Sequence, residues 1–254
     1  MKYIAIIPAR YASTRFPAKP LAMLGGKIII QHVYERVAKV FPQLCVATDD
    51  LRIKQAVENF GGVAVMTSTA HRSGTDRCYE AYCKMNSDAD VVVNVQGDEP
   101  FIATSQLHTI MDCFNDPTTE IATLVKPFTH KATIEQIENP NSPKVVVSND
   151  GYALYFSRSV IPYLRGIAKE EWTKHHNFLK HIGLYAYKAD VLKRITAMPQ
   201  GILEQAESLE QLRWLQAGLR IKVGSTDVET IGIDTPEDLK RAEEFLKSGN
   251  TDLI

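Results

Sequence analysis

The first 34 residues of this chain contain neither aspartate nor glutamate. Because their only formally charged side chains are five cations, this stretch carries a formal charge of +5, whereas the whole chain of 254 residues sums to −1. The five are Lys2, Arg10, Arg15, Lys19 and Lys27. Three of them lie in the loop of residues 9–20, among small alanine and serine residues. Such a loop suits a polyphosphate that needs both charge and close backbone approach, with an ordinary solvated basic surface as the alternative.

Paired cysteine motifs, long apolar runs and an overall basic balance are also missing. The four cysteines, Cys45, Cys78, Cys83 and Cys113, show no CxxC spacing, so we expect reduced thiols rather than structural zinc. The chain has 29 basic and 30 acidic residues, which argues against a nucleic-acid partner. No segment approaches the roughly 20 apolar residues of a membrane span, and no signal peptide opens the chain. We expect a cytoplasmic protein with no membrane partner.

Familiar phosphate and hydrolase motifs are absent as well. The sequence has no Walker pattern and no GxGxxG after a predicted strand, which disfavours P-loop and dinucleotide folds. No serine, histidine and aspartate fall in a nucleophile-elbow context. His175, His176 and His181 lie in or beside a polar linker, where histidines are more often surface or hydrogen-bonding groups than metal ligands.

Short apolar runs alternate with helical patterns through the first 115 residues. This alternation is typical of repeated βα units and predicts an α/β fold with a mainly parallel sheet flanked by helices. The predicted strands span residues 2–7, 44–47, 63–66 and 90–95, and the predicted helices span residues 28–40, 51–60 and 78–85. A polar loop, residues 71–77, precedes the third helix.

The middle of the chain changes character. The apolar runs 145–147 and 152–156, joined through Asn149-Asp150-Gly151, predict a hairpin, and residues 182–187 predict a further strand. We expect one domain, residues 1–254, into which residues 129–181 are inserted as an antiparallel arm. The aromatic content of this arm suits a subunit interface.

The end of the chain returns to the α/β pattern. Residues 204–217 predict one helix, and residues 220–223 and 229–233 predict strands. Thr235 and Pro236 have the capping residue and first-turn proline that begin a helix. Asp234 is thereby predicted at the carboxyl end of a strand.

Charged clusters therefore follow three predicted strands. The first is the cationic loop of residues 9–20, the second is the segment of residues 96–100, and the third is Asp234. Parallel sheets bind ligands at the carboxyl ends of their strands, so these clusters are expected to converge. Asp98 and Asp234 would supply oxygen ligands for Mg²⁺, which takes few carboxylates and completes its shell with phosphate and water. The alternatives are structural roles. Asp234 would help to cap the following helix, and Asp98 would be a structural acid whose charge is offset by a cation or a hydrogen-bond donor.

The sequence resembles the 3-deoxy-manno-octulosonate cytidylyltransferases, or CMP-Kdo synthetases, along its whole length. The opening block is residues 6–21, IIPARYASTRFPAKPL. Later blocks are VATD (46–49), SGTDR (73–77), NVQGDEP (94–100), YALYFSR (152–158), HIG (181–183), ESLEQLR (207–213) and GIDTPED (232–238). Their order and spacing make the match specific.

The resemblance implies a Rossmann-like nucleotidyltransferase fold and a reaction in which CTP and Kdo give CMP-Kdo and pyrophosphate. The product would activate Kdo for the inner core of lipopolysaccharide. Mg²⁺ is the implied cofactor, and a homodimer the implied assembly.

The resemblance also implies roles for individual residues. Those implied for CTP are Ala9, Arg10, Ser13, Lys19, Ala47, Asp49, Ser73, Thr75 and Arg77. Those implied for Kdo are Arg15, Gln96, Arg158, Arg165, His181 and Glu210. Asp98 and Asp234 match the metal ligands, and with Arg10 and Lys19 they form the implied catalytic set.

Some features leave alternatives open. Ile28 stands where the family commonly has proline, and residues 165–177 match poorly. A CMP-sialic acid synthetase, a nucleotide-sensing module without catalysis, and a close eight-carbon analogue of Kdo as the sugar are the other interpretations.

Overall fold

The structure is a computed structural model that describes residues 1–12, 16–228 and 231–248. The chain divides into two compact units, and each is described by itself. Unit 1 comprises the described residues within 1–108, 184–196 and 228–254. Unit 2 comprises residues 109–183 and 197–227.

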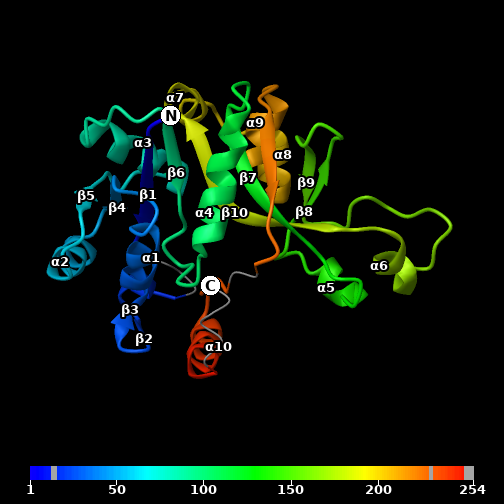
Figure 1. Cartoon of the computed structure of the whole chain (residues 1–254), viewed down its shortest axis with the longest axis horizontal. Coiled ribbons are helices and arrows are strands. Elements are labelled where there is room, and N and C mark those ends of the chain that lie inside the picture. Colours follow the sequence, from blue (N-terminus) through cyan, green and yellow to red (C-terminus); the bar gives the residue numbers. More distant parts are fainter. Residues whose placement is uncertain (13–15, 229–230, 249–254) are drawn as a thin grey trace. The chain divides into compact units, whose positions relative to one another are not determined.

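The sheet of unit 1 is mostly parallel (Figure 1). Its central strand, β1 (Tyr3–Ala9), pairs in parallel with β4 (Leu44–Thr48) and β6 (Val91–Asn94), and β4 pairs with β5 (Ala64–Met66). The last part of β10 (Leu179–Lys188) runs antiparallel to β6. Because β4 and β6 are buried at every position, they need the continuous apolar runs that the sequence displays.

Three of the helices of unit 1 begin at a side-chain cap. The helices are α1 (Ile29–Val37), α2 (Leu51–Asn59), α3 (Gly74–Lys84), α7 (Ala189–Thr196) and α10 (Pro236–Lys247). The side chains of Asp50, Ser73 and Thr235 accept backbone hydrogen bonds at the starts of α2, α3 and α10. A cluster of buried side chains, Leu24, Ile29, Phe101, Ile233 and Ala242, ties α10 to the rest of the unit.

Shorter elements connect these. They are η1 (Lys19–Leu21), β2 (Met23–Leu24) and β3 (Lys27–Ile28), the last two forming a small antiparallel pair. The helix α4 (Thr104–Asp112) follows β6 in the sequence and leads into η2 (Cys113–Asn115).

Several predictions for unit 1 are wrong. The first strand runs through Pro8 to Ala9 rather than ending at residue 7. The first helix ends at Val37, not at residue 40. The third begins at Gly74, because Ser73 caps it, so residues 74–77 belong to the helix rather than to a loop. Residues 231–233 do not form a strand, and the other two residues of that prediction, 229 and 230, lie outside the described residues.

Unit 2 combines a parallel pair with antiparallel strands. β7 (Ile121–Pro127) runs parallel to β11 (Ile221–Ser225), and β7 had no predicted counterpart in the sequence. β8 (Lys144–Val147) and β9 (Ala153–Ser157) form the predicted hairpin, and the first residues of β10 pair antiparallel with β8. The expectation of a mainly parallel α/β fold with antiparallel strands added is confirmed.

The region 129–181 lies wholly in unit 2 and contains a small core of its own, formed by Ile137, Trp172 and Phe178. Its helical elements are α5 (Ile134–Glu138), η3 (Lys169–Glu171) and α6 (Trp172–His175). Its role as a dimerisation arm stays a prediction.

The predicted single helix 204–217 is wrong. Unit 2 has two helices there, α8 (Ile202–Glu207) and α9 (Gln211–Gln216), separated at Ser208, whose φ is 51°. The Arg158 guanidinium donates to the carbonyls of Glu207 and Ser208 at 2.6 and 3.2 Å. In a continuous helix those carbonyls would accept from the next turn, so the arginine contacts stabilise the break.

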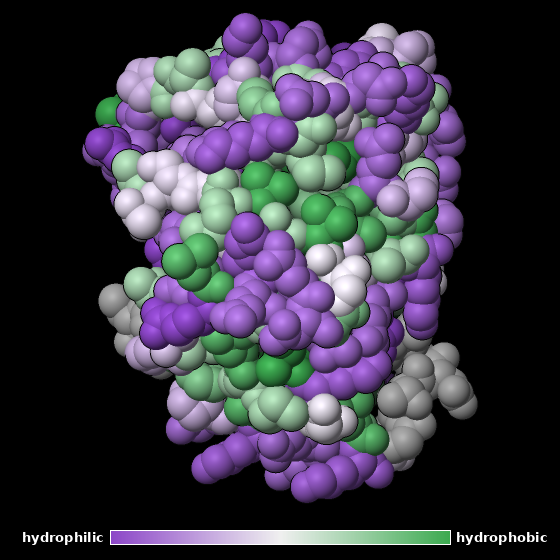
Figure 2. All heavy atoms as spheres, turned by 90° about the vertical axis from the view of Figure 1, so that its left-hand side faces the viewer, coloured by the Kyte–Doolittle hydropathy of each residue, from purple (hydrophilic) through white to green (hydrophobic). Residues whose placement is uncertain are grey.

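Hydrophilic side chains cover much of the face on which α2 and the edge strand β5 lie, with apolar groups set between them (Figure 2). Leu51 of α2 and Val63, just before β5, are exposed large hydrophobic residues. Across the described ranges, no helix combines the length and the apolar character needed to traverse a bilayer.

Candidate functional site

The carboxyl ends of β1, β4 and β6 meet at one edge of the unit 1 sheet. The register pairs Ala9 with Thr48, and Ile6 with Asn94, so the loops after β1 and β6 leave from the same side. Gly97 allows their close approach, because a Cβ at this position would lie 2.8 Å from the Pro8 carbonyl oxygen. The cationic loop and the loop bearing Asp98 are therefore neighbours.

Asp234 lies at the same edge, but it does not follow a strand as predicted. The Ile233 backbone N–H donates to the Asp98 carbonyl oxygen at 2.9 Å, which fixes the chain beside Asp98. The capping box of α10 then holds the following turn, since the Asp234 and Thr235 backbone N–H groups both donate to the Asp238 carboxylate.

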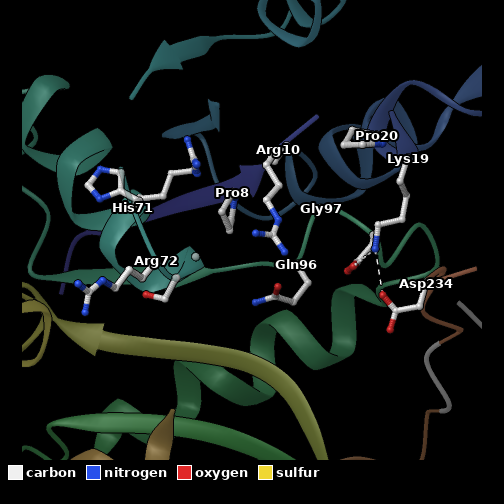
Figure 3. Close-up of a pocket in the computed structure, with 14 residues that line it drawn as sticks. Pro8, Arg10, Lys19, Pro20, His71, Arg72, Gln96, Gly97 and Asp234 are labelled. Atoms are coloured by element: carbon white, nitrogen blue, oxygen red, sulfur yellow. Dashed lines mark hydrogen bonds and ion pairs between the residues drawn. The ribbon is translucent and has the colours of Figure 1, made fainter. Parts of the chain in front are cut away.

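Lys19 joins the two acids. Its Nζ lies 2.5 Å from Asp98 Oδ2 and 3.1 Å from Asp234 Oδ1, and its side chain is 13% exposed. The preceding residue, Ala18, has a φ of 58°, and this left-handed turn leads into the short helix that carries Lys19. The loop thereby directs an ammonium group between two carboxylates from distant parts of the sequence (Figure 3).

These groups line a cavity of about 270 Å³. Its lining is Pro8, Ala9, Arg10, Lys19, Pro20, His71, Arg72, Ser73, Gly74, Arg77, Gln96, Gly97, Asp98 and Asp234. In Figure 3, Lys19 and Asp234 lie at one end, Arg10 and Gln96 in the middle, and His71 and Arg72 at the other end. Charged and polar groups from several elements thus surround one hollow.

The cations of the cavity differ in how they are balanced. Arg77 is 4% exposed, pairs with Asp49 at 2.8 Å and donates to Thr67 Oγ1 at 2.6 Å. Arg10 and Arg72 are exposed and contact no carboxylate among the described residues. Their two uncompensated charges make the cavity attractive to an anion.

The carboxylates fit a magnesium ion. Lys19 shows that one cation can contact both Asp98 and Asp234. Within residues 1–12, 16–228 and 231–248, no three His, Cys, Asp or Glu side chains form a cluster that could hold a metal. Two carboxylates alone are the donor set that Mg²⁺ uses when a phosphate substrate and water complete its shell.

Eight of the residues implied for CTP, Kdo or catalysis line this one cavity: Ala9, Arg10, Lys19, Ser73, Arg77, Gln96, Asp98 and Asp234. Ala47 is buried in β4, Thr75 is buried in the first turn of α3, and Asp49 pairs with Arg77. The implied residues Ser13 and Arg15 lie outside the described residues.

The remaining residues implied for Kdo belong to unit 2. The ring of His181 contacts Thr123 Oγ1 at 3.0 Å, and burial lowers the pKa of His181 to about 3. Glu210 accepts a hydrogen bond from Arg213 at 2.6 Å, and Arg165 is exposed. Arg158 donates to backbone carbonyls, including that of Pro140 at 2.8 Å. Their role in binding Kdo stays a prediction.

Sequence reasoning missed His71 and Arg72 as cavity residues. Both lie in the polar loop that precedes α3. A polar loop between a strand and a helix was therefore the feature of the sequence that could have identified them as site residues. What singles out His71 is its contact with Glu80 of α3, which only the folded chain brings together.

Comparison with solved structures first defines the fold. The chain is similar to a 4-diphosphocytidyl-2C-methyl-D-erythritol synthase from Anaerococcus prevotii, with 14% identity and a TM-score of 0.63 over 97% of this chain and 99% of that one. It is also similar to a cytidylyltransferase from Leptospira borgpetersenii, with 17% identity and a TM-score of 0.60 over 98% of this chain and 87% of that one. The chain therefore has the fold of these two proteins.

Closer comparisons define the family. A sequence model described as cytidylyltransferase matches residues 4–221. A 3-deoxy-manno-octulosonate cytidylyltransferase of Bacteroides thetaiotaomicron is 66% identical over 98% of this chain and 99% of the relative. A solved CMP:2-keto-3-deoxy-manno-octonic acid synthetase complexed with CTP is 42% identical, with a TM-score of 0.89 over 98% of this chain and 100% of that one. The chain belongs to the cytidylyltransferase family, among the 3-deoxy-manno-octulosonate cytidylyltransferases.

Proposed function

We propose that this protein transfers CMP from CTP to the anomeric hydroxyl of 3-deoxy-manno-octulosonate (Kdo), giving CMP-Kdo and pyrophosphate. The observation that carries the proposal is the cavity in which Arg10, which contacts no carboxylate of the described residues, lies near the cluster of Lys19, Asp98 and Asp234. The high identity to relatives named for this activity supports it.

In this reaction the anomeric oxygen forms a bond to the α-phosphorus of CTP as the bond to the bridging oxygen of pyrophosphate breaks. The electron pair leaves with pyrophosphate, and the hydroxyl proton passes to solvent. No covalent enzyme intermediate is required, so the protein contributes positioning and charge stabilisation. Arg10 and Lys19 would hold the triphosphate, and Lys19 would offset charge on the α-phosphate and the leaving group.

We propose that Asp98 and Asp234 hold Mg²⁺. When bound, Mg²⁺ supplies neutralising charge for the triphosphate and lowers the pKa of a coordinated hydroxyl. The two carboxylates would leave Lys19 free to contact phosphate oxygens, which carry the opposite charge. Gln96, which lines the middle of the cavity, would hydrogen-bond the sugar.

Further parts of the proposal concern the setting of the enzyme. CMP-Kdo would serve as the activated sugar for the inner core of lipopolysaccharide, and the enzyme would work in the cytoplasm as a homodimer. Arg158, Arg165, His181 and Glu210 would bind Kdo. His181 would hold a sugar hydroxyl rather than move a proton, because the pKa of about 3 keeps its ring neutral.

A pyrophosphate-release assay tests the function. The purified protein receives CTP and Mg²⁺ with Kdo, with sialic acid or with no sugar. Release that needs Kdo, with CMP-Kdo identified by mass, is the expected result. Release only with sialic acid would reassign the sugar, and CTP binding without any release would make the chain a nucleotide-sensing module.

A further inference from the structure

His71 is a cavity residue to which the proposed reaction gives no role. It lines the end of the cavity away from Lys19 and Asp234 (Figure 3). If the triphosphate lies against Arg10 and Lys19, the opposite end of the nucleotide falls toward His71. That end of a nucleotide is its base.

The carboxylate of Glu80 holds the imidazole of His71. Glu80 Oε2 contacts His71 Nε2 and also accepts a hydrogen bond from the Ser68 backbone N–H at 2.8 Å. Lys84 Nζ lies 2.6 Å from Glu80 Oε1 and donates to the Met66 carbonyl at 2.9 Å. Two residues one turn apart on α3 thus hold both the imidazole of His71 and the preceding backbone at Met66 and Ser68.

The contact with Glu80 requires a proton on Nε2 of His71. Burial opposes the charge on Glu80, but hydrogen bonds from Lys84, Ser68 and His71 lower its pKa to about 2. At neutral pH the carboxylate is therefore ionised and can only accept, so His71 Nε2 must be the donor. In the neutral imidazole, Nδ1 is then an acceptor, and it has no hydrogen-bond partner among the described residues.

An oriented acceptor distinguishes cytosine from uracil. At position 4 cytosine carries an amino group that donates, whereas uracil carries a carbonyl oxygen that only accepts. We propose that His71 determines base specificity by accepting a hydrogen bond from the cytosine 4-amino group, and that Glu80 is the positioning residue that fixes its tautomer. This inference rests on the proposed use of CTP.

The test compares CTP with UTP as substrates. The ratio of kcat/KM for CTP to that for UTP is measured with Kdo and Mg²⁺ for the unchanged protein and for His71→Ala, His71→Asn and Glu80→Gln. His108→Ala is the matched control, because His108 is an exposed histidine on α4. Calorimetric binding of CTP and UTP without sugar gives a readout that is independent of turnover.

We expect His71→Ala to lower the CTP/UTP ratio at least about tenfold, the scale of one lost hydrogen bond. His71→Asn should recover part of the preference, since its amide oxygen accepts. Glu80→Gln should lower the ratio without removing the ring, because an amide can donate to Nε2 and so no longer fixes the tautomer. The control should keep the original ratio.

The outcomes separate this inference from the proposed function. An unchanged protein that makes no CMP-Kdo would refute the proposed function. An active protein that prefers CTP, and keeps that preference in folded His71→Ala and His71→Asn variants, would refute the role of His71. Loss of preference in the His71 variants but not in Glu80→Gln would refute only the positioning role of Glu80.

Discussion

The ammonium group of Lys19 lies 2.5 Å from a carboxylate oxygen of Asp98, 79 positions further along the chain. Asp234 contacts the same nitrogen at 3.1 Å, so one ammonium group contacts two acids. The proposed Mg²⁺ would compete with Lys19 for these oxygens, and the lysine would then turn to the anionic substrate. The contact therefore connects metal binding with triphosphate binding.

Lys19→Met should bind divalent cations more tightly than the unchanged protein when nucleotide is absent. Removing the ammonium removes a cation that competes with the metal for both carboxylates, which on the scale of a charge-assisted hydrogen bond gives roughly a tenfold gain. Calorimetry with Mg²⁺, or Mn²⁺ binding followed by electron paramagnetic resonance, measures it. Weaker metal binding in this variant would contradict the competition.

The same variant should turn over more slowly. Loss of a donor that stabilises charge in the transition state costs on the order of 10² to 10³ in kcat. Steady-state kinetics at saturating CTP and Kdo measure this loss. If kcat stayed the same and only the KM for Kdo rose, Lys19 would be a sugar-binding residue.

Asp98→Asn should remove most of the Mg²⁺-dependent activity, because the neutral amide is a poor ligand for a hard cation. We expect a fall in kcat/KM of at least about 10², and magnesium titrations of activity are the measurement. Asp88→Asn is the control, since Asp88 is an exposed acid that pairs with Lys2. Equal activities of the two variants would contradict the metal assignment.

Glu80→Gln should destabilise the protein at neutral pH but not in acid. The pKa of Glu80 falls from 4.5 to about 2 on folding, so its stabilisation is fully present above pH 4.5 and is lost as the pH falls toward 2. We expect a difference of about 1–3 kcal/mol in the free energy of unfolding at pH 7, which narrows as acid is added. Urea titrations at pH 7, 5 and 3 follow it. A difference independent of pH would contradict the ionised contact.

Thiol reagents should modify one cysteine of the native protein. Cys83 is exposed, whereas Cys45, Cys78 and Cys113 are buried. Burial also raises the pKa of Cys45 to about 12 and that of Cys113 to about 11, which suppresses the reactive thiolate. Titration with a chromogenic disulfide should count one thiol per native chain and four in denaturant. Rapid reaction of a second native thiol would contradict this burial.

The proposed homodimer predicts a light-scattering mass of two chains. Leu154 and Tyr163 of the region 129–181 are 62% and 72% exposed, and such large apolar side chains suit a subunit interface. Leu154→Glu should weaken the dimer. Leu51→Glu is the control, as Leu51 is exposed on α2, outside this region. A mass of one chain for the unchanged protein at micromolar concentration would refute the assembly.

The parallel sheet was predictable because its strands are buried on both faces. The sequences of β4 and β6 are mostly apolar, as expected for buried strands, and the turn residues Asn-Asp-Gly predict the hairpin of β8 and β9. The start of α10 was equally readable, since capping is a local matter of Thr235 and Pro236. Local sequence patterns were therefore sufficient to predict the parallel strands, the hairpin and the start of the last helix.

Features that depend on distant contacts were not predictable. The break at Ser208 relies on hydrogen bonds from Arg158, 50 residues away, so the periodicity of residues 204–217 indicated one helix. Asp234 was expected beside Asp98 for a wrong reason, because a single backbone hydrogen bond replaces the supposed strand. The contact between His71 and Glu80 could not be predicted either, because the fold brings the two side chains together.

The attachment of Ile233 to Asp98 joins the last part of the described chain to a loop formed much earlier in the sequence. During synthesis on the ribosome, every strand of the described residues leaves the exit tunnel before Asp234 does. The nascent chain can therefore assemble its sheet while the cluster around Lys19 still lacks one acid. The helix α10 that follows Asp234 packs on the earlier chain through Phe245 and Phe101, whose ring centroids lie 5.0 Å apart. A chain that ended before Asp234 would contain every strand of the two units described above but would lack one acid of the proposed Mg²⁺ site.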